Sequence, residues 1–158
     1  MTVALTRKAV WEETYRGIYP QEMLDDYDPK DFACRDEERI RFGNHHYYLF
    51  LDQGKCIGYF SFGPYNFGSY KDFSLCLNNL YIRKEYRGKG LGRQAFDCIR
   101  EYCVRRGISK FFCGCNAHNA PASGFYRHMG GVQGDAFVPH KQKSDDIIHF
   151  EFHIGERI

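Results

Sequence analysis

The sequence lacks the features that direct a chain to a membrane or to a polyanionic partner. No apolar run approaches the roughly eighteen residues that cross a bilayer. No signal-peptide pattern opens the chain, because charges at Arg7, Lys8 and Glu12 interrupt every apolar stretch there. The 22 Lys and Arg residues are nearly balanced by 20 Asp and Glu residues, and this net charge of +2 is too mild for a dedicated nucleic-acid binder. We therefore expect a cytoplasmic protein with no membrane and no nucleic-acid partner.

Internal divisions and paired metal-ligand motifs are missing as well. No repeat or linker divides the 158 residues, so we expect residues 1–158 to form a single domain. The seven cysteines are an odd number without an export signal, which favours reduced thiols. The tightest cluster, Cys113-Gly114-Cys115 with His118, lacks the Cys-x-x-Cys pairs typical of zinc sites. We expect no bound metal.

The most informative segment runs from Leu80 to Arg93, with the sequence LYIRKEYRGKGLGR. An apolar strand leads into three alternating glycines and then directly into a helix. Glycines allow consecutive backbone N–H groups to face one anion, and a new helix offers its unpaired N–H groups to the same point. Arg87 and Lys89 add positive charge. The pattern predicts a site for a diphosphate.

The glycine spacing excludes the two commonest phosphate-binding loops. A nucleoside-triphosphate loop ends in Gly-Lys-Ser/Thr, and no such ending follows Gly88. A dinucleotide fingerprint requires G-x-G-x-x-G, whereas Gly88, Gly90 and Gly92 are two residues apart and Arg93 follows them. A different diphosphate-bearing cofactor is therefore expected.

The pattern Arg87-x-x-Gly90-x-Gly92, after a strand that ends at Ile82, resembles the acetyl-CoA pyrophosphate signature of the GNAT superfamily. These proteins are acyl-CoA-dependent N-acyltransferases. The resemblance implies acetyl-CoA (coenzyme A) as cosubstrate.

A second segment, NAPASGFYRHMG from Asn119 to Gly130, resembles the superfamily's other cofactor segment. There an asparagine starts a short helix, and an aromatic-tyrosine pair closes over the cofactor. Many relatives continue with a phenylalanine, whereas Gly131 and Val132 follow here, so we expect a wider or more mobile turn at this corner. Together the two segments imply that the following residues bind the cofactor: Leu80, Tyr81, Ile82, Arg87, Gly88, Lys89, Gly90, Leu91, Gly92, Arg93, Asn119 and Tyr126.

Apolar periodicity and turn residues predict the elements of the fold. Helices are expected over residues 2–15, 20–24, 31–42 and 90–106, with a further short helix after Asn119. Strands are expected over residues 47–52, 56–62, 74–82, 109–115, 132–139 and 147–154. The succession of strand, helix and strand between residues 74 and 115 predicts a parallel crossover.

The resemblance implies an α+β fold, in which helices flank a central mixed, mostly antiparallel sheet with that one parallel crossover. In relatives the two parallel strands splay apart, and the pantetheine arm of the cofactor enters the gap. Relatives usually open with a strand, but only residues 1–5 precede the helical pattern here. Either the first strand is missing or the assigned start is late. Residues 47–52 are then expected to form an exposed sheet edge, which favours a homodimer.

The resemblance also assigns the chemistry to particular residues. Tyr126 is the general acid that protonates the departing thiolate; the alternative is that Phe125 and Tyr126 only form the core face of their helix. Relatives often hold a glutamate base on the preceding strand, where this chain has Asn78 and Asn79. Because amides cannot take up a proton, Asn78 is a candidate for holding a water that relays it.

A carboxylate or imidazole elsewhere is the other route for the proton. Glu22, Asp72 and His118 are the candidates for that base. Tyr15, Tyr19 and Glu22 are the candidates for contacting the acceptor, because the first two helices and their connecting loop border the acceptor in this fold.

The resemblance therefore implies an N-acetyltransferase that uses acetyl-CoA. Its acceptor is a primary amine of a small molecule, an amino acid or a peptide, which attacks directly in a ternary complex. Two other classes stay open. A non-catalytic acyl-CoA sensor would keep the glycine loop and need no base, and an interaction module would use the basic face around Arg83, Lys84 and Arg87.

Overall fold

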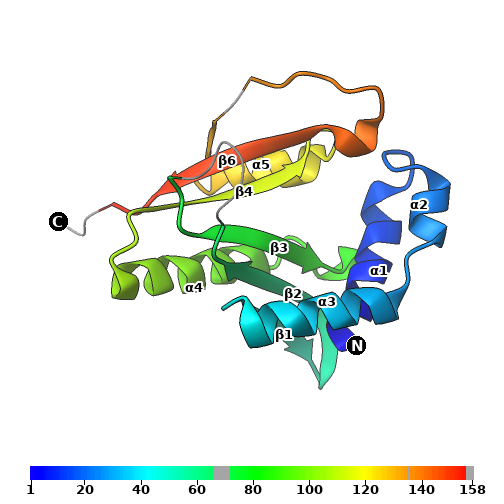
Figure 1. Cartoon of the computed structure of the whole chain (residues 1–158), viewed down its shortest axis with the longest axis horizontal. Coiled ribbons are helices and arrows are strands. Elements are labelled where there is room, and N and C mark those ends of the chain that lie inside the picture. The colour runs from blue at the N-terminus through cyan, green and yellow to red at the C-terminus, as the bar shows by residue number, and fades with distance from the viewer. Residues whose placement is uncertain (66–71, 135, 156–158) are drawn as a thin grey trace.

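The computed structural model describes residues 1–65, 72–134 and 136–155. A six-stranded sheet in the order β1-β2-β3-β4-β6-β5 forms its centre (Figure 1). The strands are β1 His46–Asp52, β2 Lys55–Gly63, β3 Cys76–Ile82, β4 Lys110–Asn116, β5 Val132–Gln133 and β6 Ile147–His153. The helices are α1 Thr2–Tyr15, α2 Gln21–Asp25, α3 Pro29–Phe42, α4 Leu91–Arg106 and α5 Ala120–His128, with short 3₁₀ turns η2 Lys84–Tyr86 and η3 Lys143–Asp145. Among the paired strands, β3 and β4 are parallel and the other pairs are antiparallel, so the predicted mixed sheet is confirmed.

The helices lie on both faces of the sheet. In Figure 1, α3 crosses in front of the sheet and α5 passes behind it. Side chains alternate between the faces of a strand, so Tyr59 of β2 contacts α1 while its neighbour Phe60 joins the core beneath α4 and α5. No helix in the described part of the chain is long and apolar enough to cross a membrane.

The main core lies between the sheet and the helices α4 and α5. Ala95, Phe96 and Ile99 recur on one face of α4 and are fully buried. The Phe96 ring lies 5.8 Å from that of Phe111 on β4 and 4.9 Å from that of Phe152 on β6. Helix α4 therefore packs against both strands of the β4–β6 pair.

A buried ion pair fastens α1 and α3 to the other face. Arg7 and Asp36 are 4% and 5% exposed, and the Arg7 guanidinium donates two hydrogen bonds to the Asp36 carboxylate at 2.9 and 3.0 Å. Arg7 Nε also donates to the Tyr59 hydroxyl at 2.6 Å, and the Tyr47 hydroxyl donates to Asp36 at 2.9 Å. Two helices and two strands meet at this network.

Most predicted elements are confirmed, including the helix over residues 2–15, the first hairpin and the edge position of β1. Helix α3 begins two residues earlier than expected, because Asp28 accepts a hydrogen bond from the Lys30 N–H at its start. Within the described residues no strand precedes α1, which starts at Thr2.

The prediction of a strand over residues 132–139 is correct only for Val132 and Gln133. Strand β5 covers only Val132–Gln133, and Gly134 N donates the last hydrogen bond to His149 O. Further along, the His140 N–H donates to the Asp146 carboxylate at 2.6 Å. That carboxylate draws the segment away from β6, so the ladder does not continue.

The turn after α5 is narrow, so the expectation of a wider turn there is wrong. Gly131 N donates to Tyr126 O at 2.9 Å. A Cβ at Gly131 would lie 2.7 Å from the Phe152 ring and 2.9 Å from Tyr126 O. The corner is closely packed, and the glycine is what permits the close approach.

We expect Asp36→Ala to destabilise the fold by about 3–5 kcal/mol, since it leaves the Arg7 charge buried without its partner. Chemical denaturation measures the free energy of unfolding. Glu37→Ala is the matched control, because Glu37 forms an exposed pair with Arg41 on the same helix and its loss costs about 0.3–0.5 kcal/mol. Equal losses for the two variants would show that the buried pair contributes no more than a surface one.

Candidate functional site

A groove opens where β3 and β4 part. The two strands pair only through Cys76 with Phe112 and Leu77 with Cys113. Beyond these pairs lies a groove of about 490 Å³. Its walls are β3 from Leu77 to Ile82, the glycine loop with the start of α4, Gly114 and Cys115 of β4, and the exposed side of α5 with its cap Asn119.

A bulge in β3 explains why the strands part at this point. On β2, Ser61 pairs with Asn79 and Phe62 pairs with Leu77, so Asn78 has no residue opposite it. A bulge increases the local twist and bends its strand. From Asn78 onward, β3 stays paired with β2 but not with β4, so its backbone groups on the β4 side face the groove. The splay that the resemblance implied is present.

The glycine loop forms one end of the groove. Gly88 and Gly90 have φ values of +74° and +84°, in the left-handed region that suits glycine. Gly90 is the N-cap of α4, so the free N–H groups of the first turn follow directly at Leu91. These donors and the positive end of the helix dipole suit an anion.

Basic side chains border the same end. Arg87 lies between the loop and α1, since its Nε donates to Ile82 O at 2.9 Å and its Nη2 donates to Thr14 Oγ1 at 3.0 Å. Arg93 and His128 approach one another at 3.5 Å. All three line the groove. Of the twelve residues expected to bind the cofactor, Lys89 is the one outside the lining, with its Nζ over the Tyr86 ring at 5.0 Å.

Gly92 has a packing role in addition to the one its position in the motif indicates. A Cβ there would lie 2.7 Å from Cζ of Phe125, so a larger residue would collide with α5 rather than fill the groove. A Cβ at Gly90 would meet nothing within 4 Å, so this position is open to the groove. Both glycines line the groove; Gly92 also permits the close packing of α4 against α5, and Gly90 permits the loop conformation.

Tyr126 lies on α5 at the other end of the groove. Asn119 starts this helix by accepting a hydrogen bond from Ala122 N at 3.2 Å. The Tyr126 side chain is 6% exposed, packs against Phe150, and lines the groove. Burial raises the pKa of Tyr126 well above its ordinary value, and the nearby thiol of Cys113 raises it further. The hydroxyl is therefore protonated at neutral pH and is available as a proton donor.

The two asparagines of β3 differ in their contacts. Asn79 Nδ2 donates to Ser61 Oγ across the sheet at 2.7 Å, an ordinary cross-strand bond. Asn78 Oδ1 is buried and has no hydrogen-bond partner among the described residues. Leaving such an acceptor unpaired costs about 1–3 kcal/mol. Since Asn78 lines the groove, this oxygen is a place where a bound molecule or a water can donate.

The residues expected near the acceptor are only partly brought together. Tyr15 is 7% exposed and lines the groove, and the Tyr19 ring stacks on it at 4.3 Å. Burial raises the pKa of Tyr19 to about 12, with the nearby Tyr81 adding to the effect. Glu22 and Asp72 are exposed and outside the lining.

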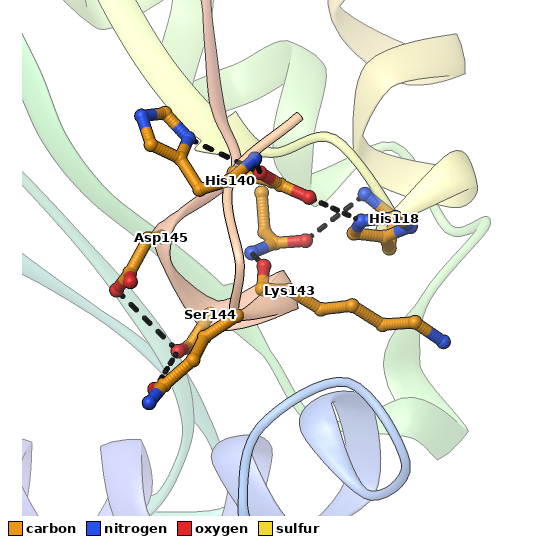
Figure 2. A network of polar contacts seen from close by, with 8 residues as sticks. His118, His140, Lys143, Ser144 and Asp145 are labelled. Carbon is orange, nitrogen blue, oxygen red and sulfur yellow. Dashed lines mark hydrogen bonds and ion pairs between the residues drawn. The ribbon is translucent and has the colours of Figure 1, made fainter. Parts of the chain in front are cut away.

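His118 belongs to a polar network at the end of β4. His118 Nε2 lies 2.7 Å from Asp146 Oδ2, and His140 approaches the same carboxylate from the other side (Figure 2). Asn116 Nδ2 donates to Lys143 O, and Asn116 Oδ1 accepts from His118 N. The His140 backbone N–H and then the His118 ring lower the pKa of Asp146. The network holds the turn around η3 against β4, and the sequence offered no local signal for Asp146.

A family of known proteins matches most of the chain. The family model described as Acetyltransferase (GNAT) family matches residues 8–130. The chain belongs to the GNAT family. It is similar to the bovine (Bos taurus) protein thialysine N-epsilon-acetyltransferase, with 24% identity over 78 residues. That match covers 49% of this chain and 46% of the bovine protein, so just under half of that relative is spanned.

Solved structures share the fold at low sequence identity. The PaiA N-acetyltransferase from Thermoplasma acidophilum, solved in complex with coenzyme A, superposes with a TM-score of 0.74 at 17% identity, covering 96% of this chain and 91% of that one. The ribosomal-protein-alanine N-acetyltransferase from Brucella melitensis has a TM-score of 0.70 at 20% identity, with 95% and 93% covered. The GNAT architecture thus extends over nearly the whole chain.

Proposed function

We propose that this protein transfers the acetyl group of acetyl-CoA to a primary amine of a small molecule, an amino acid or a peptide. The observation that carries the proposal is the groove between the diverging strands β3 and β4. An anion-binding helix start borders one end and a buried tyrosine borders the other. Membership of the GNAT family supports it. We assign the activity to residues 1–158 as one domain.

The cofactor occupies the groove along its length in this proposal. Its diphosphate binds the loop and the α4 start, where Arg87 and Arg93 supply charge. The pantetheine arm takes up the backbone groups of β3 that β4 leaves unpaired, and Asn119 borders its far end. The full set consists of Leu80, Tyr81, Ile82, Arg87, Gly88, Lys89, Gly90, Leu91, Gly92, Arg93, Asn119 and Tyr126.

The transfer is a direct attack in a ternary complex. The amine nitrogen forms a bond to the thioester carbonyl carbon, and the carbon–sulfur bond breaks. A β3 amide near Leu80 and Tyr81 stabilises the oxyanion. The leaving thiolate takes the proton of Tyr126, which carries its proton at neutral pH, and the tyrosinate is then reprotonated from solvent. Asn78 Oδ1 holds a water in the relay that carries a proton away.

The acceptor binds beside Tyr15 and Tyr19, with Glu22 at the edge of that region on α2. The names of two relatives indicate the range of acceptors: thialysine for the bovine protein and a ribosomal-protein alanine for the Brucella one. Both are primary amines. The alternative function is a non-catalytic acyl-CoA sensor, which is favoured by a groove lining that holds no carboxylate among the described residues.

We also propose that the edge strand β1 pairs with a second copy to form a homodimer. β1 is the terminal strand of the sheet, and Leu49 and Leu51 on it are 44% and 60% exposed. Light scattering is expected to give twice the monomer mass, about 37 kDa from the chain mass of 18.6 kDa. A monomer across micromolar concentrations would count against the pairing.

Replacing Gly90 by valine should weaken coenzyme A binding by at least tenfold. A β-branched residue is strained at this positive φ and its side chain would project beside the diphosphate site. Calorimetry with coenzyme A measures the affinity. Gly54→Val is the matched control, because Gly54 also has a positive φ of +79° and open space but lies in the β1–β2 turn. An equal loss of coenzyme A affinity in both variants would show that the glycine loop does not bind the cofactor.

Thiol release from acetyl-CoA tests the function itself. The acceptors are thialysine, a hexapeptide that begins with alanine, and putrescine, with coenzyme A binding measured on the same protein. Amine-dependent release is expected for at least one acceptor. Tight binding with no release from any of the three would favour the sensor.

In that assay Tyr126→Phe should lower kcat by about 10²-fold or more, the usual contribution of a general acid. Coenzyme A affinity should change little, because the ring and its packing stay. Tyr65→Phe removes a hydroxyl outside the groove lining and serves as the control. An unchanged rate for Tyr126→Phe would exclude the tyrosine as the acid.

A further inference from the structure

We propose that Glu13 of α1 is a positioning residue for coenzyme A, because it fixes the glycine loop and holds Arg87 beside the diphosphate site. The inference rests on the proposed function, in which the cofactor binds along the groove. Glu13 itself lies outside the groove lining, so it acts through the residues that it holds. No local pattern in the sequence distinguishes it from the other charged residues of its helix.

The Glu13 carboxylate reaches three donors on the segment that follows β3. Its Oε1 accepts a hydrogen bond from Arg83 Nε at 2.6 Å, and its Oε2 accepts one from Lys84 N at 2.9 Å. Arg87 Nη2 lies 3.8 Å from the same Oε2. The Glu13 side chain is 19% exposed, and hydrogen bonds to a charged group are stronger where water is partly excluded. Glu13 therefore ties both ends of the η2 turn to α1.

The loop has few other attachments. Within residues 84–90, all of which are described, only Tyr86 packs against the main core. The Tyr86 hydroxyl donates to Asp52 Oδ2 at 3.1 Å, and the other residues of this segment are exposed. A segment that buries little apolar surface opens readily unless polar contacts hold it. The positions of the loop N–H groups therefore depend strongly on the Glu13 contacts.

The Arg87 guanidinium is fastened through two of its three nitrogens. Nε donates to Ile82 O at 2.9 Å, and Nη2 donates to Thr14 Oγ1 at 3.0 Å, next to the Glu13 carboxylate. An arginine carries five N–H donors in a rigid planar fork. Nη1 has no hydrogen-bond partner among the described residues, and Arg87 lines the groove. Its N–H groups are therefore available to a phosphate oxygen, in an orientation that α1 sets.

A second acid near the loop separates positioning from simple charge. Glu85 approaches Arg83 Nη2 at 3.9 Å, but its side chain is 55% exposed. Loss of either acid removes one negative charge near the diphosphate site, which by charge alone would favour an anion. Of the two, only Glu13 also contacts Lys84 N and Arg87. A loss of affinity specific to Glu13 would therefore report its contacts and not its charge.

Glu13→Ala is expected to weaken coenzyme A binding by about tenfold, because the loop and Arg87 lose a common support. Calorimetry with coenzyme A on the full chain measures the affinity. In the thiol-release assay the KM for acetyl-CoA should rise by a similar factor, while kcat at saturation stays within about twofold. Glu85→Ala is the matched control and should leave the affinity unchanged or slightly higher. A general loss of structure would lower kcat as well.

A double-mutant cycle tests whether Glu13 acts through Arg87. In an Arg87→Ala background, Glu13→Ala should weaken binding by only about threefold, since the two residues then no longer share a contact. Arg93→Ala is the comparator, because Arg93 borders the same end of the groove but contacts His128. Its effect and that of Glu13→Ala should multiply. Glu13→Gln keeps the size of the side chain and an acceptor for Lys84 N, so it should give a smaller loss even where Glu13→Ala fails to fold.

The outcomes separate this role from the proposed function. Wild-type affinity in Glu13→Ala and Glu13→Gln, or the same loss with and without Arg87, would overturn the positioning role and leave the transferase function in place. Failure of the wild-type protein to bind coenzyme A would overturn both. Binding without turnover by the wild type would overturn the transferase function alone, because the affinity cycle would still decide the role of Glu13.

Discussion

Parallel pairing between β3 and β4 ends after two residue pairs, and the candidate site depends on that early end. The bulge at Asn78 turns β3 toward β2, so the backbone groups of its second half have no neighbouring strand. Unpaired backbone groups at the middle of a sheet are costly unless a ligand satisfies them. The glycine loop at the end of β3 and the cap of α5 after β4 then border the same gap, because each directly follows one of the two strands.

The two ends of the gap differ in the charge of the residues that line them. Arginines and a helix start surround the end where the diphosphate is proposed to bind, and neutral donors surround the other. Burial raises the pKa of Tyr15 and of Tyr126, so these hydroxyls carry protons rather than charge. A neutral and poorly hydrated surrounding favours the uncharged form of an amine, which is the form that attacks a thioester.

Sequence reasoning succeeded where the signal was local. Gly107 ends α4 with a left-handed conformation, and Asn119 caps α5, as their residue types predict. The glycine loop that borders the groove was recognisable because its glycines lie close together in the chain. The failures concern contacts between distant residues. Arg7 and Asp36 lie on two different helices and pair only in the folded chain. Residues 132–139 have the composition of a strand, but only Val132 and Gln133 form one, and the His140 N–H donates to the Asp146 carboxylate instead.

The short contact between β3 and β4 also divides the sheet into two halves, β1-β2-β3 and β4-β6-β5, joined by only two residue pairs. Few backbone hydrogen bonds resist a change in the distance between the halves. The apolar core beneath them is continuous, with Phe96 of α4 packed against β4 and β6 and Leu77 of β3 in the same cluster. The packing of side chains between α4 and the two halves of the sheet therefore sets the width of the groove.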